Sequence, residues 1–196
     1  MDNSEDKGAA APPLANPAPL GLAAFALTTF CLSMFNSGVI GDSALEAEVL
    51  PLALFYGGLA QFAAGLLEFK RGNTFGLTAF TSYGAFWMAF AGYVKFVVPG
   101  LDPAHTHVAT GLFLIAWFIF TLYMTVAATT LDKATLAVFA ALTLTFLFLA
   151  LGAFCESTAL TRIGGWLGLL TAFLAWYASF AGVVNETRGR KIIPVG

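Results

Sequence analysis

The sequence predicts an all-α membrane protein with six transmembrane helices. After residue 48, five runs of 19 or more residues contain no Asp, Glu, Lys, Arg or His, at 49–67, 72–94, 108–131, 134–155 and 163–185. About 20 apolar helical residues cross a hydrocarbon core roughly 30 Å thick, so each run is long enough to span a bilayer. Hydrophobic residues make up 59% of the chain, charged residues 10%, and the mean hydropathy is +0.82. Too few charges remain to cover a water-exposed globule.

The first of the six spans precedes these runs, at 20–40, and the acidic loop 42–48 separates it from the second. Asn16 can cap this helix, and Pro17 suits its first turn because proline lacks the N–H that would be unpaired there. The free N–H groups at such a helix start can hold a carboxylate, although the same residues also form an ordinary cap.

One face of the first span carries polar side chains among apolar ones. The residues of this face recur at spacings of four, three and four, and they are Phe25, Thr29, Leu32 and Asn36. Thr28 lies beside them. An Asn in mid-membrane is costly unless it faces protein or water, so we expect this face to look into the bundle. An interhelical hydrogen bond and a role in a solute path both explain Asn36.

The second span holds a single amide, Gln61, one turn from a glycine on either side. Gly57 and Gly65 allow a neighbouring helix to approach closely while the amide finds a partner. The span ends at three charged residues whose long side chains are expected to reach water: Glu68, Lys70 and Arg71.

Further polar candidates for lining a path lie in the later spans. Hydroxyls gather around Thr81 and Tyr83, which favours a partly wet cavity, although such groups also bond their own helix carbonyls. The fifth span adds Thr143 and the sixth adds Tyr177. No span has an ionisable Asp, Glu, Lys, Arg or His near its middle. A small uncharged solute would meet rings, hydroxyls and amides there, whereas a charged one would be poorly compensated.

Lys and Arg flanking the spans predict that both termini are cytoplasmic. In that orientation the inside holds seven of them, namely Lys7, Lys70, Arg71, Lys133, Arg188, Arg190 and Lys191. The outside then holds only Lys95 and Arg162, in agreement with the positive-inside rule. We expect a disordered cytoplasmic tail at 1–15, a six-helix domain at 16–186 and a cytoplasmic C-terminal tail at 187–196, in the inner membrane of the cell.

Two short segments of the third span recur in the sixth. The residues LTAF occur at 77–80 and at 170–173, and FAG occurs at 90–92 and at 180–182. Three spans later the chain runs in the opposite direction, as expected for a 3+3 inverted repeat around a midplane site. In a chain this rich in Ala and Phe, coincidence is an equal explanation.

No motif for catalysis, a cofactor, a metal or nucleic acid is present. His105 and His107 could bind a metal, but without Cys or Asp partners at suitable spacing an ordinary solvated loop is the better interpretation. Cys31 and Cys155 are isolated and are expected to pack as small apolar residues. We therefore expect no cofactor, no metal, no nucleic-acid partner and no enzyme activity.

Four sequence blocks give a more specific indication. They are NPAPLGL at 16–22, FYGGLAQ at 55–61, GNTFGLTAFTSYG at 72–84 and NETRGR at 185–190. With them the chain resembles the acetate uptake transporter family, which includes bacterial succinate/acetate permeases and yeast acetate transporters. The resemblance covers residues 16–196 and implies a hexamer of six-helix protomers, each with its own path for acetate and sometimes succinate.

The resemblance also implies roles for individual residues. Phe25, Tyr83 and Leu142 correspond to the family's hydrophobic constriction, and Ala175 bears on substrate size together with Leu142. A ring of apolar side chains can gate a narrow pore by excluding water, and a neutral acid passes it at far lower cost than a carboxylate. We therefore expect proton-linked passage of a small monocarboxylate, as symport or through a channel. A channel for a neutral solute such as urea or ammonia is the alternative.

Overall fold

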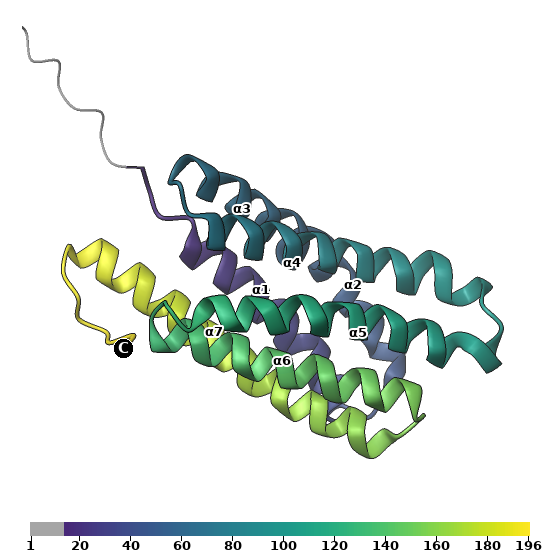
Figure 1. Cartoon of the computed structure of the whole chain (residues 1–196). Coiled ribbons are helices and arrows are strands. Elements are labelled where there is room, and N and C mark those ends of the chain that lie inside the picture. Colours follow the sequence, from purple (N-terminus) through teal and green to yellow (C-terminus); the bar gives the residue numbers. More distant parts are fainter. Residues whose placement is uncertain (1–13) are drawn as a thin grey trace, which may run out of the picture.

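The computed structural model describes residues 14–196, and these fold into a bundle of long helices (Figure 1). The α-helices are α1 (Ala18–Asn36), α2 (Val49–Leu54), α3 (Gln61–Lys70), α4 (Thr74–Gly92), α5 (Pro103–Ala128), α6 (Lys133–Phe154) and α7 (Thr158–Arg188). The 3-10 turns η1 (Ser43–Glu48) and η4 (Val98–Gly100) and the π-helical segments η2 (Phe55–Ala60) and η3 (Tyr93–Val97) join or extend them. Residues 14–196 contain no strand, which confirms the expected all-α class. Lys7 and most of the expected tail at 1–15 lie outside the described residues.

Five helical stretches are long and apolar enough to cross a membrane. They are Ala18–Asn36, Ala44–Lys70, Pro103–Ala128, Lys133–Phe154 and Thr158–Arg188. The chain is thus a multi-pass membrane protein. The span predicted at 72–94 forms the 19-residue helix α4, which packs along α3 but is not among the five. Its glycines, Thr, Ser and Tyr make it less apolar than the others, and a count of six crossings remains a prediction.

Side-chain caps start most of these helices at the sequence positions that favour them. Asn16 Oδ1 accepts a hydrogen bond of 3.1 Å from the Ala18 N–H, close to the expected start of α1. The N-caps of α4, α5, α6 and α7 also accept bonds from first-turn N–H groups, namely Asn73, Asp102, Asp132 and Ser157. At the other end of α7, Gly189 adopts a φ of +62°, which glycine tolerates at a helix C-terminus.

The glycines of the second span bring helices together within one chain. A Cβ added at Gly57 would lie 2.5 Å from Thr28 Oγ1, and one added at Gly65 would lie 2.3 Å from Thr81 Oγ1. Each hydroxyl therefore packs against the backbone of a neighbouring helix. The close approach expected for this span occurs within one chain, where η2 meets α1 and α3 meets α4.

The bundle has two ends, which we name by what lies there (Figure 1). At the terminal end lie the start of α1, the turns at 71–73 and 129–132, and the end of α7. The loop end holds η1, η4 and the turn at 155–157. The helix α1 packs on α7 and also on α3. The backbones of α4 and α5 seldom approach closely, and aromatic side chains such as Tyr83 and Trp117 fill the space between them.

The last residues fold back on the terminal end instead of extending into solvent. The Asn185 amide accepts from the N–H groups of Ile192 and Ile193 at 2.7 and 2.9 Å, and donates to the Ile193 carbonyl at 2.9 Å. The Tyr177 hydroxyl donates to the Pro194 carbonyl. The Ala134 N–H donates to the Val195 carbonyl at 2.9 Å. We call residues 190–196, held in this way, the C-terminal clamp.

Candidate solute path

Three cavities follow one another through the bundle and share lining residues. The loop-end cavity has a volume of about 320 Å³, and the terminal-end cavity about 570 Å³. Between them lies a middle void of about 20 Å³. Phe25 and Leu142 line both the loop-end cavity and the middle void, while Leu22 lines both the middle void and the terminal-end cavity. Each large cavity is therefore a neighbour of the middle void, separated from it by side chains that line both.

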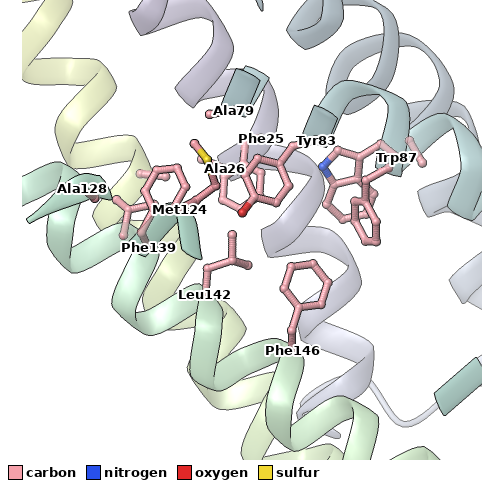
Figure 2. Close-up of a cluster of buried hydrophobic side chains, with 14 of the residues drawn as sticks. Phe25, Ala26, Ala79, Tyr83, Trp87, Met124, Ala128, Phe139, Leu142 and Phe146 are labelled. Carbon is pink, nitrogen blue, oxygen red and sulfur yellow. The ribbon is translucent and has the colours of Figure 1, made fainter. Parts of the chain in front are cut away.

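Phe25, Tyr83 and Leu142 meet at the middle void. These side chains come from α1, α4 and α6, are 3 to 4% exposed, and point toward one another (Figure 2). The rings of Phe25 and Tyr83 have centroids 5.7 Å apart. Other aromatic rings hold Tyr83 in place, with centroid distances of 5.3 Å to Phe120 and 6.0 Å to Trp117. Three side chains that the sequence placed in different spans thus form one apolar plug.

The hydroxyl of Tyr83 is hydrogen-bonded. Its oxygen lies 2.9 Å from Thr121 Oγ1, and Thr121 Oγ1 lies 2.7 Å from the Trp117 carbonyl. Either hydroxyl can be the donor in the contact between Tyr83 and Thr121. When Thr121 donates to the Trp117 carbonyl, which only accepts, Tyr83 donates to Thr121.

Gln61 lines the middle void beside this plug. Its side chain is 1% exposed, and within residues 14–196 its Oε1 has no hydrogen-bond partner. The hydrogen-bond partner expected for this amide is therefore not found for its oxygen among the described residues. Ala175 is 0% exposed and belongs to the same apolar cluster as Leu142, although it lines none of the three cavities.

The other predicted polar residues divide into two groups. Thr29 and Asn36 line the loop-end cavity, and Asn16 lines the terminal-end cavity. Four of the expected path-lining residues line none of these three cavities: Thr28, Thr81, Thr143 and Tyr177.

Each of these four side chains has another structural setting. Thr28 and Thr81 pack on the glycines described above. The Thr143 hydroxyl donates to the Phe139 carbonyl at 2.9 Å and lies 2.7 Å from Thr125 Oγ1. Tyr177 is 41% exposed and serves the C-terminal clamp.

Trp87 is a lining residue that the sequence interpretation left without a role. It is 2% exposed, lines the loop-end cavity, and its Nε1 has no partner within residues 14–196. Tyr83, Trp87 and Phe90 follow one another at helical spacings of four and three, so they share one face of α4. That spacing from Tyr83 could have identified Trp87 as a residue that lines the cavity.

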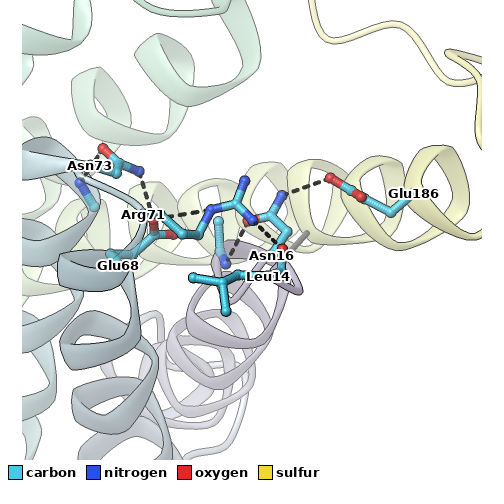
Figure 3. A network of polar contacts seen from close by, with 8 residues as sticks. Leu14, Asn16, Glu68, Arg71, Asn73 and Glu186 are labelled. Carbon is cyan, nitrogen blue, oxygen red and sulfur yellow. Dashed lines mark hydrogen bonds and ion pairs between the residues drawn. The ribbon is translucent and has the colours of Figure 1, made fainter. Parts of the chain in front are cut away.

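A buried carboxylate anchors the terminal end of the bundle (Figure 3). Glu68 is 0% exposed, accepts a 2.9 Å hydrogen bond from Asn73 Nδ2, and lies 3.9 Å from Arg71 Nε. Arg71 also donates to the Leu14 carbonyl at 3.0 Å, and Asn16 Nδ2 lies 3.2 Å from Glu186 Oε1. Glu68 was expected to reach water with Lys70 and Arg71. It instead turns inward, because Asn73 and Arg71 offer it donors.

The loop-end histidines sit beside single carboxylates. His105 Nδ1 lies 3.6 Å from Asp102, and His107 Nδ1 lies 4.0 Å from Glu156. Within the described part of the chain no group of three or more His, Cys, Asp or Glu side chains could hold a metal ion.

Comparison with known proteins agrees with the transport interpretation. The succinate-acetate/proton symporter SatP of Escherichia coli K12 is 42% identical over 183 residues, which are 93% of this chain and 96% of that protein. Acetate permease A of Emericella nidulans is 43% identical over 92% of this chain and 65% of its own length. A solved structure of the bacterial acetate channel SatP matches with a TM-score of 0.87 and 42% identity, over 94% of this chain and all of that one.

These relatives are transporters or channels and not enzymes. The family model of the GPR1/FUN34/yaaH proteins matches residues 4–195, which is nearly the whole chain. The match thus extends well beyond the four sequence blocks, and the all-helical bundle agrees with it. The chain belongs to the GPR1/FUN34/yaaH family.

Proposed function

We propose that this protein carries acetate, and other small carboxylates such as succinate, across the cytoplasmic membrane through the passage in each protomer. The observation that carries the proposal is the series of three neighbouring cavities, in which Phe25 and Leu142 line both the loop-end cavity and the middle void and Leu22 lines both the middle void and the terminal-end cavity. The loop-end cavity is large enough for a small carboxylic acid, whereas the middle void is not. Phe25, Tyr83 and Leu142 therefore act as the gate, and transit requires these side chains to move.

The chemistry of the gate favours an uncharged solute. The residues that line the middle void include no Asp, Glu, Lys, Arg or His. Removing a carboxylate from water without a counter-charge is far more costly than removing the neutral acid. Passage of the solute is thus linked to a proton, because the neutral acid carries that proton with it. The protein can then work either as a symporter or as a channel for the acid.

The charge distribution supports a terminal end that faces the cytoplasm. Six of the Lys and Arg residues in the described chain lie there: Lys70, Arg71, Lys133, Arg188, Arg190 and Lys191. Lys95 and Arg162 lie at the loop end. With α4 as a membrane-crossing helix the chain crosses six times, and both termini are then cytoplasmic. Assembly as a hexamer follows from the resemblance given above.

Flux measurements with purified protein in proteoliposomes test this function. Uptake of acetate, succinate, lactate and urea is measured under one set of conditions and corrected for empty liposomes. We expect protein-dependent acetate flux that exceeds urea flux. Protein-dependent urea flux without acetate flux would refute the proposal and favour the neutral-solute channel.

A further inference from the structure

The C-terminal clamp forms one wall of the terminal-end cavity. Its residues Arg190, Lys191 and Val195 line this cavity of about 570 Å³, and most of the other lining residues belong to α1, α6 and α7. Figure 1 shows the clamp leaving the end of α7 and returning to the bundle. The clamp itself contains no helix. This wall of the cavity can therefore move without the movement of a helix.

The clamp is attached by few contacts. Beyond the turn at its start, five hydrogen bonds hold it, of which three converge on the side chain of Asn185 and the others come from Tyr177 and Ala134. No residue of the clamp is buried, and no ion pair in the described chain includes Arg190 or Lys191. Neutral hydrogen bonds contribute little net free energy, and ordering the clamp costs conformational entropy. The clamp is thus held weakly, and mainly by one side chain.

Other contacts hold α7 on α1 without the clamp. Ser179 Oγ is buried and donates to the Pro19 carbonyl at 2.7 Å. Closer to the end of α7, Asn16 Nδ2 lies 3.2 Å from Glu186 Oε1. Both contacts join α7 to the start of α1, and neither involves the clamp. Release of the clamp would therefore remove one wall of the cavity and leave the helices in place.

We infer that the C-terminal clamp is a strap that closes the terminal-end cavity, and that Asn185 is the latch that holds it. While the latch holds, Arg190, Lys191 and Val195 restrict access to the cavity. When the latch releases, these residues leave and the cavity opens to the solution at that end of the bundle. Segments with few hydrogen bonds and little buried surface are those that open locally in native proteins. Access to the cavity is a property of the fold, so this inference goes beyond the proposed function and holds for any solute.

Labelling of a cysteine inside the cavity tests the strap. Ala178, Gly182 and Asn185 recur at spacings of four and three, so they share one face of α7, and all three line the cavity. The variant Ala178→Cys, combined with Cys31→Ala and Cys155→Ala, carries a single thiol two turns along α7 from the latch. The rates of its reaction with N-ethylmaleimide and with the larger fluorescein maleimide are measured in nanodiscs, where both ends of the bundle are accessible.

The substitutions that loosen the strap are added to this cysteine protein. Asn185→Ala removes three hydrogen bonds and should raise the rate with fluorescein maleimide about tenfold or more, since each net hydrogen bond is worth a factor of about two to ten. Asn185→Asp keeps an acceptor for two N–H groups and should raise the rate less. Tyr177→Phe removes a separate attachment and should raise the rate about twofold to tenfold. Asn36→Ala is the matched control, because it removes an amide at the loop-end cavity, and it should leave the rate unchanged.

Two results would overturn the inference. One is a folded Asn185→Ala protein whose Cys at position 178 reacts at the rate of the cysteine protein without that change. If Asn185→Ala does not fold, the same result with Tyr177→Phe decides. The other is an intact clamp that already lets fluorescein maleimide react as fast as it does with an exposed cysteine introduced as Lys70→Cys. Labelling needs no transported solute, so a failure of the acetate flux measurements would leave this test unaffected.

Discussion

Thr121→Val should turn the Tyr83 hydroxyl, at the gate, from a hydrogen-bond acceptor for the solute into a hydrogen-bond donor. Thr121 Oγ1 lies 2.9 Å from the Tyr83 oxygen, and we expect it to accept the Tyr83 proton in the wild type while Thr121 donates to the Trp117 carbonyl. Valine has nearly the same shape and no lone pair, so in the variant the Tyr83 O–H has no partner on that side. Its proton is then free to bind a carboxylate oxygen. The variant should pass acetate at pH values where the undissociated acid is scarce.

The magnitude follows from the bond that is gained. A hydrogen bond to a charged group contributes about 1.5 to 3 kcal/mol. If this lowers the barrier for the anion by the same amount, anion flux rises about tenfold to a hundredfold, since each 1.4 kcal/mol is a factor of ten. The unpaired hydroxyl also costs stability in the empty protein, by about 1 to 3 kcal/mol. The variant should therefore unfold at a lower temperature while conducting more anion.

Acetate flux against pH at fixed voltage, in proteoliposomes, measures the effect. Thr121→Ser is the matched control, because it keeps the hydroxyl that bonds both Tyr83 and Trp117, and it should retain the wild-type profile. Adding Tyr83→Phe to Thr121→Val removes the freed donor and should abolish the gain. A folded Thr121→Val protein with the wild-type pH profile would show that the Tyr83 proton is not held by Thr121, and the assignment of its direction would be wrong.

Three further predictions concern other parts of the chain. Leu142→Ala and Ala175→Gly remove buried volume at and beside the gate without adding charge, so the ratio of lactate to acetate flux should rise; an unchanged ratio in folded variants would remove both residues from size selection. Asn73→Ala removes the cap of α4 and the donor to the buried Glu68, and should lower the unfolding free energy by about 1 to 3 kcal/mol, measured as a fall in Tm; an unaltered Tm would mean that the network around Glu68 adds no stability. Cysteines introduced as Lys70→Cys and Arg190→Cys should resist an impermeant maleimide applied outside intact cells, and labelling of either would reverse the assigned orientation.

The helices themselves were readable from the sequence because bilayer thickness leaves little freedom. A long run without charges must be helical, since the backbone has no other partners in hydrocarbon. The predicted ends of the helices still differ from those in the structure where a helix continues beyond its apolar residues into polar or charged ones. The sixth span, expected at 163–185, forms the 31-residue helix α7, because its polar ends continue the helix beyond the apolar part.

The site was readable only in part. Phe25, Tyr83 and Leu142 were placed through the resemblance, since nothing in the composition of three separate spans shows that they meet. Helical spacing indicated that Thr29 and Asn36 share one face, and the structure lines the loop-end cavity with both. Tyr177 could not be placed in this way, because its partner is a backbone carbonyl in the clamp and a carbonyl leaves no mark in the sequence.

The C-terminal clamp also decides how the protein should be handled. Gly196 lies close to the start of α6, where a Cβ added to it would be 2.6 Å from Lys133 Cβ, and Arg190, Lys191 and Val195 line the terminal-end cavity. A purification tag or fluorescent reporter fused after Gly196 would thus begin beside the mouth of the passage. Such a fusion would strain the clamp or cover the mouth. Transport rates are best compared before and after proteolytic removal of the tag.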